Sequence, residues 1–457
     1  MKGLAKLKSH IPGIGWPAIA DPVAANLLAL LAQLEESQWW TAERLARRQL
    51  DQFSLLAQHA WQQSPFFRKR FEQAGLDPRQ IWTTESFASI PLLTRGELMQ
   101  HAEHIHCHSL PRGHGAVQQI QTSGSTGQVV GVRKTEVNQL LWLALALREH
   151  LWHERDFSAT LAVIKAITPT LDDPAKAAQL GWGHPATLLF ATGPSYSQPL
   201  AMDVKQQAAW LARIDPKYLL TYPSNLSALL DLYETGTPFP HSLRQVRTVG
   251  ETLHPGLRER CAALKGIEIV DLYSAQEVGL IALQCPLSGL YHIQSESLIV
   301  EVLDDAGKQC EPGEVGRVVI TDLHNFATPL IRYEIRDYAE VGPVCPCGRG
   351  LPTLSRIMGR RRNMVTLPDG SKHWPLVGAY RYREIADIRQ YQAIQHSLHN
   401  IEIRLVVSPL TREQETAISA LVQQALGYPF RLRFSYFEQE LPGTRGGKFE
   451  EFLSLVS

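Results

Sequence analysis

The sequence has no long apolar run, no excess of charge of either sign and few cysteines, and each absence excludes a class of protein. Forty-five basic residues balance forty-five acidic ones over 457 residues, so overall charge favours neither nucleic acid nor a membrane surface as a partner. No stretch reaches the ~18 uninterrupted apolar residues that a membrane span requires. Six unevenly spaced cysteines are too few for a disulfide scaffold and indicate a reducing compartment.

The N-terminus is basic, but Asp21-Pro22 interrupts the apolar stretch that follows, and no small-residue cleavage site comes after it. We therefore expect a cytoplasmic protein. The chain has no internal repeat and no low-complexity tract, and its length predicts two or more domains.

Hydrophobic patterns predict an α/β protein with two unequal domains. Residues 24–75 have helical periodicity, and short apolar runs alternate with amphipathic stretches from about 118 to 277, as in a layered α/β domain. Closely spaced β-like runs then predict a small antiparallel or barrel-like subdomain over about 285–350. A fresh β-α-β pattern near the C-terminus predicts a small α+β domain. The expected domain bounds are 1–358 and 359–457.

The run from Gln121 to Gly127 is rich in hydroxyl residues and contains two glycines. Glycine lets backbone amides approach an anion closely, and hydroxyls supply further donors, so we interpret this run as a phosphate-binding loop. The alternative is a flexible Ser/Gly connector. It is not a Walker loop, because no Gly-Lys-Ser or Gly-Lys-Thr ends it.

Further motifs follow this loop in a fixed order. They are Gly250-Glu251-Thr252, the run from Asp271 to Gly279, Thr321-Asp322-Leu323, the run from Pro329 to Asp337, Gly359-Arg360, and the run from Pro442 to Lys448. The series resembles the adenylate-forming superfamily of acyl-CoA synthetases, and specifically its phenylacetate-CoA ligase-like branch, over nearly the whole chain. The resemblance implies a large adenylation domain followed by a small mobile lid domain, which rotates between two half-reactions.

The resemblance also implies a role for each motif. The loop Thr122, Ser123, Gly124, Ser125, Thr126 and Gly127 would cradle the β- and γ-phosphates of ATP. Glu277 would bind Mg²⁺, Tyr273 would stack on adenine, and Asp337 would bind the ribose hydroxyls. Lys448 would bridge the acyl carboxylate and the α-phosphate. The other residues expected at the nucleotide are Gly250, Glu251, Thr252, Asp271, Ser274 and Arg360. Taken singly, each could instead be an ordinary core, turn or tail residue.

A second cluster of chemistry-bearing residues lies outside these motifs. Cys345 and Cys347 form a compact pair of thiols, and Cys285 and His292 lie seven residues apart on an earlier β-rich segment. Three thiolates and an imidazole would close a tetrahedral structural Zn²⁺ site. Members of the resembling branch often carry a similar set. The alternative is four unrelated reduced side chains.

We therefore expect an ATP-dependent ligase that forms an acyl-adenylate and passes the acyl group to a thiol, with coenzyme A as the expected acceptor. The resemblance implies an aromatic or arylalkanoic acid, and Trp182, Phe190 and Tyr196 are candidates for an apolar acyl pocket or for core positions. Two alternatives stay open. One is an enzyme that acylates an amine or a carrier protein, and the other is a nucleotide-binding protein that has lost catalysis. Enzymes of this branch are commonly dimers, and the oligomeric state stays open.

Overall fold

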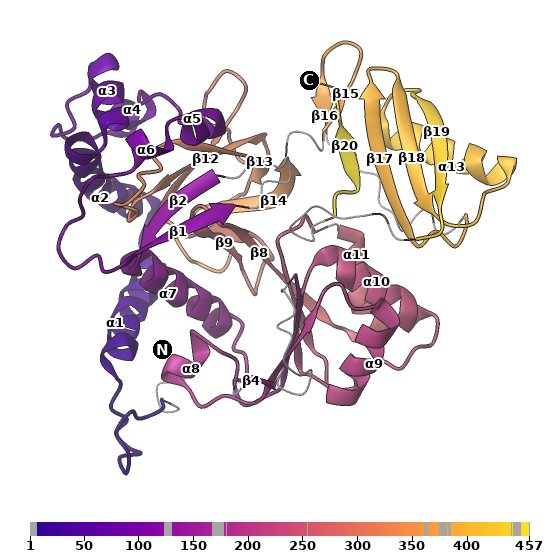
Figure 1. Ribbon diagram of the computed structural model, residues 1–457, viewed down its shortest axis with the longest axis horizontal. Coiled ribbons are helices and arrows are strands. Elements are labelled where there is room, and N and C mark those ends of the chain that lie inside the picture. Colours follow the sequence, from indigo (N-terminus) through magenta and orange to yellow (C-terminus); the bar gives the residue numbers. More distant parts are fainter. Residues whose placement is uncertain are drawn as a thin grey trace.

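The computed structural model describes residues 7–122, 130–166, 178–179, 181–253, 255–360, 364–373, 382, 385–439, 441 and 449–456. These residues form a large N-terminal part and a smaller C-terminal part, and both combine β-sheet with helices (Figure 1). The expected α/β class is confirmed.

Helices come first along the chain. They are α1 (Pro22–Ser37), α2 (Ala42–Gln63), α3 (Pro65–Gln73), α4 (Thr84–Ala88), α5 (Arg95–Gln100) and α6 (Ala102–Ile105). The Asp21 carboxylate accepts hydrogen bonds from the N–H groups of Val23 and Ala24 and so begins α1, and Thr41 caps α2 in the same way. The helical region expected over 24–75 is present.

A parallel α/β layer follows the antiparallel hairpin of β1 (Val117–Thr122) and β2 (Val130–Thr135). Its elements are α7 (Glu136–Trp152), β3 (Leu161–Lys165), β4 (Ala178–Gln179), α8 (Ala186–Leu189), β5 (Ser195–Pro199), α9 (Val204–Ile214), β6 (Tyr218–Thr221), α10 (Pro223–Glu234), β7 (Gln245–Val249), α11 (Pro255–Lys265) and β8 (Glu268–Ala275). The strands β5, β3, β6, β7 and β8 run parallel in that order. Their carboxyl ends therefore lie along one edge, where sheets of this kind bind ligands.

The antiparallel half of the same sheet is built from later strands. They are β9 (Gly279–Gln284), β10 (Tyr291–Ile293), β11 (Leu298–Leu303), β12 (Val315–Asp322), β13 (Tyr333–Val341) and β14 (Thr353–Arg360). The full order is β11-β12-β13-β14-β10-β9-β8-β7-β6-β3-β5-β4. The strands expected over about 285–350 are thus antiparallel, as expected, but they continue the parallel strands and do not close a barrel of their own.

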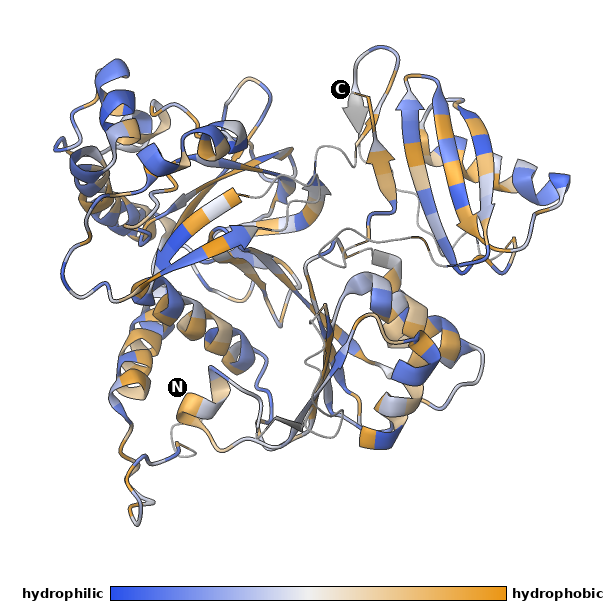
Figure 2. Cartoon of the chain, viewed as in Figure 1, coloured by the Kyte–Doolittle hydropathy of each residue, from blue (hydrophilic) through white to orange (hydrophobic). Residues whose placement is uncertain are grey.

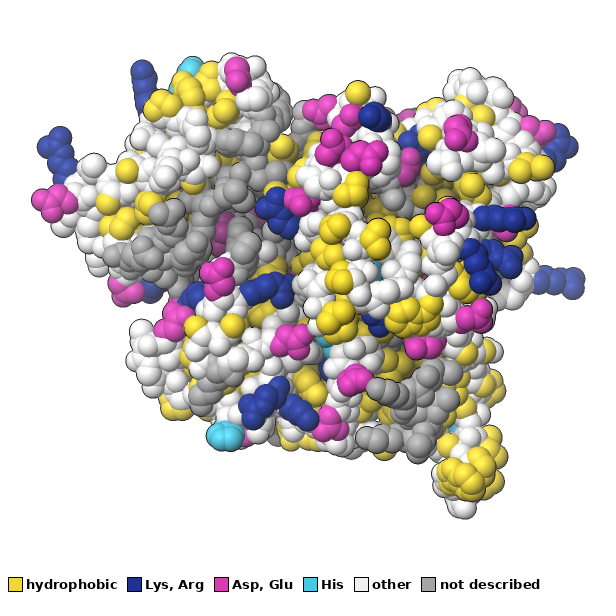
Figure 3. Space-filling model, turned by 180° about the vertical axis from the view of Figure 1, so that it is seen from behind, with side chains coloured by type: hydrophobic (Ala, Val, Ile, Leu, Met, Phe, Trp, Pro, Cys, Tyr) yellow, Lys and Arg dark blue, Asp and Glu magenta, His cyan; other side chains and the backbone are white. Residues whose placement is uncertain are grey.

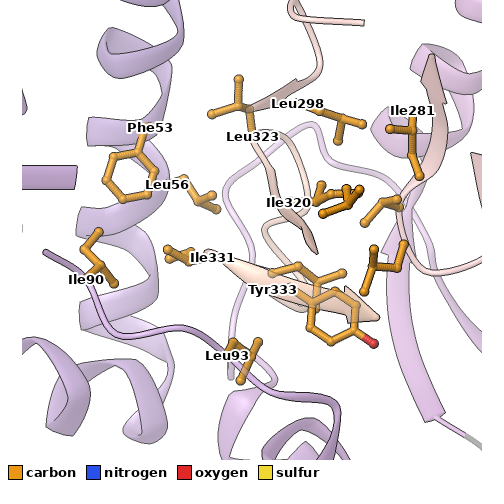
Figure 4. Close-up of a cluster of buried hydrophobic side chains, with 14 of the residues drawn as sticks. Phe53, Leu56, Ile90, Leu93, Ile281, Leu298, Ile320, Leu323, Ile331 and Tyr333 are labelled. Carbon is orange, nitrogen blue, oxygen red and sulfur yellow. The ribbon is translucent and has the colours of Figure 1, made fainter. Parts of the chain in front are cut away.

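The largest apolar core lies between the first helices and this antiparallel half. Figure 4 shows Phe53 and Leu56 of α2 pointing toward Ile331, with Ile320 of β12 beyond it. Phe53, Leu56, Ile320 and Ile331 are fully buried. Burying a side chain of this size contributes about 1.5–3 kcal/mol, so the helices and the sheet depend on each other for stability.

The C-terminal part is a separate small sheet with one long helix. Its elements are β15 (Val365–Thr366), β16 (Lys372–His373), β17 (Gln390–Ser397), β18 (Asn400–Val406), α13 (Arg412–Leu426), β19 (Arg431–Phe437) and β20 (Phe452–Ser454). Apolar and polar residues alternate along β17 and β18 (Figure 2), and Ile403 packs with Ile418 and Val422 of α13. The helix ends at Gly427, whose φ of +66 suits glycine. The small α+β domain matches the prediction.

Exposed apolar side chains gather on the segment before α1, which projects from the body of the molecule (Figure 3). Trp16 is 85% exposed, and Ile11 and Ile19 are also exposed. Within the described ranges, no helix combines the length and the apolar content that crossing a membrane would require.

The turn between α1 and α2 packs on the loop that precedes β14. The N–H of Gly350 donates to the carbonyl oxygen of Gln38 at 2.8 Å. A Cβ atom at Gly350 would overlap the carbonyl oxygen of Trp40, so only glycine fits there. This contact fixes the helical layer to the loop that carries Cys345 and Cys347.

We predict that Gly350→Ala lowers the stability of the protein by about 1–3 kcal/mol, because the backbone must move away from Trp40. The measurement is the midpoint of urea unfolding followed by tryptophan fluorescence. Gly15→Ala is the matched control, since a Cβ atom at Gly15 would meet nothing within 4 Å. Equal midpoints for the two variants would contradict the prediction.

Candidate functional site

Glu277 lies in the turn between β8 and β9, and its side chain is buried. Arg95, the first residue of α5, donates from Nη1 to Glu277 Oε1 at 2.9 Å, and both side chains are at most 9% exposed. Thr94 caps α5 together with Glu97, which holds Arg95 in the first helical turn. Glu277 is therefore a buried carboxylate whose present partner is a guanidinium.

Lys134 of β2 adds a second positive charge near this carboxylate. Burial lowers the pKa of the Lys134 ammonium, and the negative charges of Asp322 and Glu277 partly oppose that shift. The hairpin of β1 and β2 therefore brings a cation toward Glu277 from the end of the strand that follows the expected phosphate loop. Thr122 ends β1, while Ser123 to Gly127 lie outside the described residues.

Tyr273, Asp337 and Arg360 come together from three strands. The Tyr273 hydroxyl donates to Asp337 Oδ2 at 3.0 Å, and Arg360 Nε lies 3.7 Å from Asp337 Oδ1. Burial, reinforced by the charge of Asp337, raises the pKa of Tyr273 well above its ordinary value. The ring of Tyr273 belongs to the main apolar core, so the phenol is held in place by packing and by its hydroxyl.

Glu251 joins the two parts of the molecule. It follows β7 and accepts hydrogen bonds from the Ser224 N–H at 2.9 Å and the Ser224 hydroxyl at 3.0 Å. It also accepts one from the N–H of Phe449 at 2.8 Å. Burial raises the pKa of Glu251, and these hydrogen bonds oppose that shift. Phe449 belongs to the C-terminal part, so that part lies against the carboxyl edge of the parallel strands.

Thr252 lies beside Gly359, because a Cβ atom at Gly359 would come within 2.8 Å of the Thr252 hydroxyl oxygen. Gly359 has a φ of +87, which favours glycine, and it directly precedes Arg360. Of the expected residues Gly250, Glu251 and Thr252, Thr252 therefore meets the end of β14. Lys448 lies outside the described residues.

Asp271 and Ser274 occupy different surroundings from the other expected nucleotide contacts. Asp271 is buried, and its carboxylate accepts hydrogen bonds from the Thr248 hydroxyl at 2.6 Å and the Tyr291 hydroxyl at 2.9 Å. Burial raises its pKa to about 6. Asp271 thus links β8 to β7 and β10 inside the sheet, whereas Ser274 is half-buried near the end of β8.

The four candidate zinc ligands converge on one point. Cys345 Sγ lies 3.7 Å from Cys285 Sγ, Cys347 Sγ lies 3.3 Å from His292 Nε2, and all four ligand atoms lie within 4.8 Å of one another. A tetrahedral zinc with metal–sulfur bonds of about 2.3 Å has sulfur–sulfur edges of about 3.8 Å, so these residues fit the ion. His292 Nδ1 faces the Leu351 carbonyl at 3.2 Å, which leaves Nε2 directed at the thiols.

The aromatic candidates for an acyl pocket lie in packed positions. Trp182 is buried and donates from its indole N–H to the Ala159 carbonyl at 2.8 Å. Phe190 is buried and stacks on Phe157, with ring centroids 4.8 Å apart. Tyr196 packs against the cluster on the other face of the parallel strands. The structure therefore agrees with the alternative that Trp182 and Phe190 are core residues.

Arg95 and Lys134 were missed by the sequence analysis. No chemical motif marks either residue. The capping sequence from Thr94 to Glu97 predicts a helix start, which could have placed Arg95 at a helix N-terminus but not beside Glu277.

Asp322, at the end of β12, shows how burial acts on the charges near Glu277. Its carboxylate is 2% exposed and accepts a hydrogen bond from the His324 N–H at 3.1 Å. Burial raises the pKa of Asp322 to about 6, although the charge of Lys134 partly opposes the shift. Between about pH 4 and pH 6 the folded protein therefore keeps a proton that the unfolded chain has released.

We predict that the wild-type protein loses stability relative to Asp322→Asn as the pH rises from 4 to 7, by up to about 3 kcal/mol. The asparagine keeps an acceptor for the His324 N–H and removes the charge that is costly to bury. Urea unfolding of both proteins at pH 4.5 and pH 7 measures the difference. Asp305→Asn, at an exposed position, is the control, and a pH-independent difference would contradict the prediction.

Comparisons with known proteins were made by sequence and by structure. No family model matches the sequence. The chain is 23% identical over 353 residues to the phenylacetate-coenzyme A ligase of Pseudomonas putida, which covers 74% of this chain and 75% of that protein. It is 22% identical over 395 residues to the phenylacetate-coenzyme A ligase of Thermus thermophilus, covering 81% and 83%.

A solved structure of 2-hydroxyisobutyryl-CoA ligase in the postadenylation state, in complex with an acyl-AMP, superposes with a TM-score of 0.70 at 18% identity. The match covers 91% of this chain and 90% of that one. The same ligase in the thioesterification state, with CoA, gives a TM-score of 0.57 at 19% identity.

Proposed function

We propose that this chain, which shares the fold of the acyl-CoA ligases and resembles phenylacetate-coenzyme A ligases in sequence, activates a carboxylic acid with ATP and transfers the acyl group to coenzyme A. The hydrogen bond from the Phe449 N–H to Glu251 carries the proposal. It brings the residue after Lys448 to the edge where Glu277, Tyr273 and Asp337 lie. At this edge, separate side chains are available for the phosphates and for the sugar of a nucleotide.

In the first half-reaction, a carboxylate oxygen of the acid attacks the α-phosphorus of ATP, and the bond to pyrophosphate breaks. Positive charge must face the phosphates while this happens. Arg95 and Lys134 supply two cations beside Glu277, and Lys448 would supply a third at the reacting carboxylate. In the second half-reaction a thiolate attacks the acyl carbon, and AMP leaves.

Glu277 is the residue that would hold Mg²⁺, and this hard cation would neutralise part of the phosphate charge when bound. The donor set fits such an ion only if Arg95 gives up its ion pair with Glu277. The phosphates of a bound ATP would give the displaced guanidinium of Arg95 a new anionic partner. In this proposal Arg95 therefore exchanges Glu277 for the polyphosphate, and both charges stay paired in the buried site.

The relatives favour an aromatic or arylalkanoic acid as the substrate. The experiment is ATP–pyrophosphate exchange with magnesium and a panel of aryl, arylalkanoic and aliphatic acids, without coenzyme A. Exchange with one class of acid supports adenylation. Adding coenzyme A, a carrier-protein thiol or an amine then identifies the acceptor. ATP binding without exchange for any acid would contradict the proposal and favour a protein that has lost catalysis.

Lys448→Ala should reduce the exchange rate by about 100-fold or more, because a positioned cation at the developing charge is lost. The apparent affinity for ATP should change much less, since Arg95 and Lys134 remain. Lys205→Met, at an exposed lysine of α9, is the control for loss of a charge elsewhere. An unchanged exchange rate in Lys448→Ala would remove this residue from the chemistry.

We further propose that Cys285, His292, Cys345 and Cys347 bind a structural Zn²⁺ ion. Metal analysis of the purified protein should find about one zinc per chain, and Cys347→Ser should lose most of it. The midpoint of thermal unfolding should fall in parallel. Cys107→Ser is the matched control, because Cys107 is half-buried and lies outside the cluster. Equal zinc content in both variants would contradict the site.

A further inference from the structure

A group of buried charges lies between α7 and the parallel strands, away from Glu277. Glu149 of α7 is fully buried and accepts two hydrogen bonds from Arg155, at 2.6 and 2.7 Å. Arg247 of β7 approaches the same carboxylate at 2.7 Å from its Nη2 atom. Burial acts to raise the pKa of Glu149, but the two arginines outweigh it and lower the pKa. One carboxylate thus serves two guanidinium groups.

Lys165 brings a third cation to the same region. It is the last residue of β3 and is half-buried, and no carboxylate in the described part of the chain pairs with it. Burial lowers the pKa of its ammonium, and the positive charge of Arg247 lowers it further. Like charges that face each other away from bulk water cost free energy, unless an anion lies between them.

Among the described residues, the other titratable groups packed here do not supply that anion. His150 contacts Arg155, and burial lowers its pKa, so it stays neutral. Glu268 accepts a hydrogen bond from Gln245 and is about half exposed. Glu251 is already bonded to Ser224 and Phe449. The Nε atom of Arg247 is itself buried without a hydrogen-bond partner.

Lys165 lies near the carboxyl edge of the parallel strands, where we propose that the reaction takes place. Val163, Leu220 and Arg247 lie side by side on β3, β6 and β7, so Lys165 shares their face and is two residues nearer the carboxyl edge. At that edge β7 leads into Gly250 and Glu251. An acid whose reacting carboxylate lies at the carboxyl edge near β7, and whose other end extends along the edge toward β3, would reach Lys165.

We propose that Lys165 binds a second anionic group on the acid that this chain activates, with Arg247 behind it. The preferred substrates are then dicarboxylic acids, or acids with a sulfonate or phosphate substituent, in place of singly charged acids. This inference rests on the proposed ligase function. It makes Lys165 a specificity-determining residue, and a second anion would neutralise the unbalanced charge next to Arg247.

The experiment measures kcat/KM for ATP–pyrophosphate exchange with matched pairs of acids. The pairs are phenylacetate with 4-carboxyphenylacetate, benzoate with terephthalate, and hexanoate with adipate, with 4-sulfophenylacetate added to separate sulfonate from carboxylate. In at least one pair the wild type should favour the doubly charged acid by roughly 100-fold, as expected for a partly buried charge-assisted contact. Lys165→Met should abolish that preference, and Lys165→Arg should retain most of it.

Two controls separate the outcomes. Lys205→Met should keep the wild-type preference, and Lys165→Met should unfold at the same temperature as the wild type or higher, because an unbalanced buried charge has been removed. The wild type could show exchange with singly charged acids only, at a rate that is unchanged in Lys165→Met. That result would overturn this inference and would still support the proposed ligase function. No exchange with any of these acids, despite ATP binding, would overturn both.

Discussion

One buried carboxylate holds the two elements that frame the site. Glu149 ties α7, which follows the β1–β2 hairpin, to β7, which leads into Glu251. Away from water this triad of charges is costly unless every member is paired, so the spacing between helix and strand has little freedom. The hairpin and the carboxyl edge are consequently held at a fixed separation, and in the proposed reaction the nucleotide and the acid would bind between them.

The balance of charge at the site changes over a short distance. Around Glu277 a buried acid is neutralised by Arg95 and Lys134, whereas beyond β7 the cations outnumber the acids among the residues that the structure describes. A reaction between two anions, a carboxylate and a triphosphate, benefits from such a positive surface, because it reduces their mutual repulsion. The C-terminal part contacts this edge through the hydrogen bond from the Phe449 N–H to Glu251.

Contacts between distant segments could be predicted only where a motif in the sequence marked the residues. Tyr273, Asp337 and Arg360 were expected at one site and do meet, and the four zinc ligands converge although 62 positions separate Cys285 from Cys347. Arg95, Lys134 and Lys165 were missed, because a single charge on a helix or strand carries no pattern. Alternation along the strands from β10 to β14 is the same in a barrel and in an open sheet, so the continuous sheet could not be foreseen.

The continuity of that sheet places the two expected metal sites at opposite ends of one strand. Glu277 lies two residues before β9, and Cys285 directly follows it. The six residues of β9 span about 20 Å at the rise of an extended chain. A paramagnetic ion such as Co²⁺, bound by the cysteines, would therefore lie at a fixed distance from Glu277. Magnetic resonance could then measure the distance from this ion to a bound nucleotide and the change of that distance through the catalytic cycle.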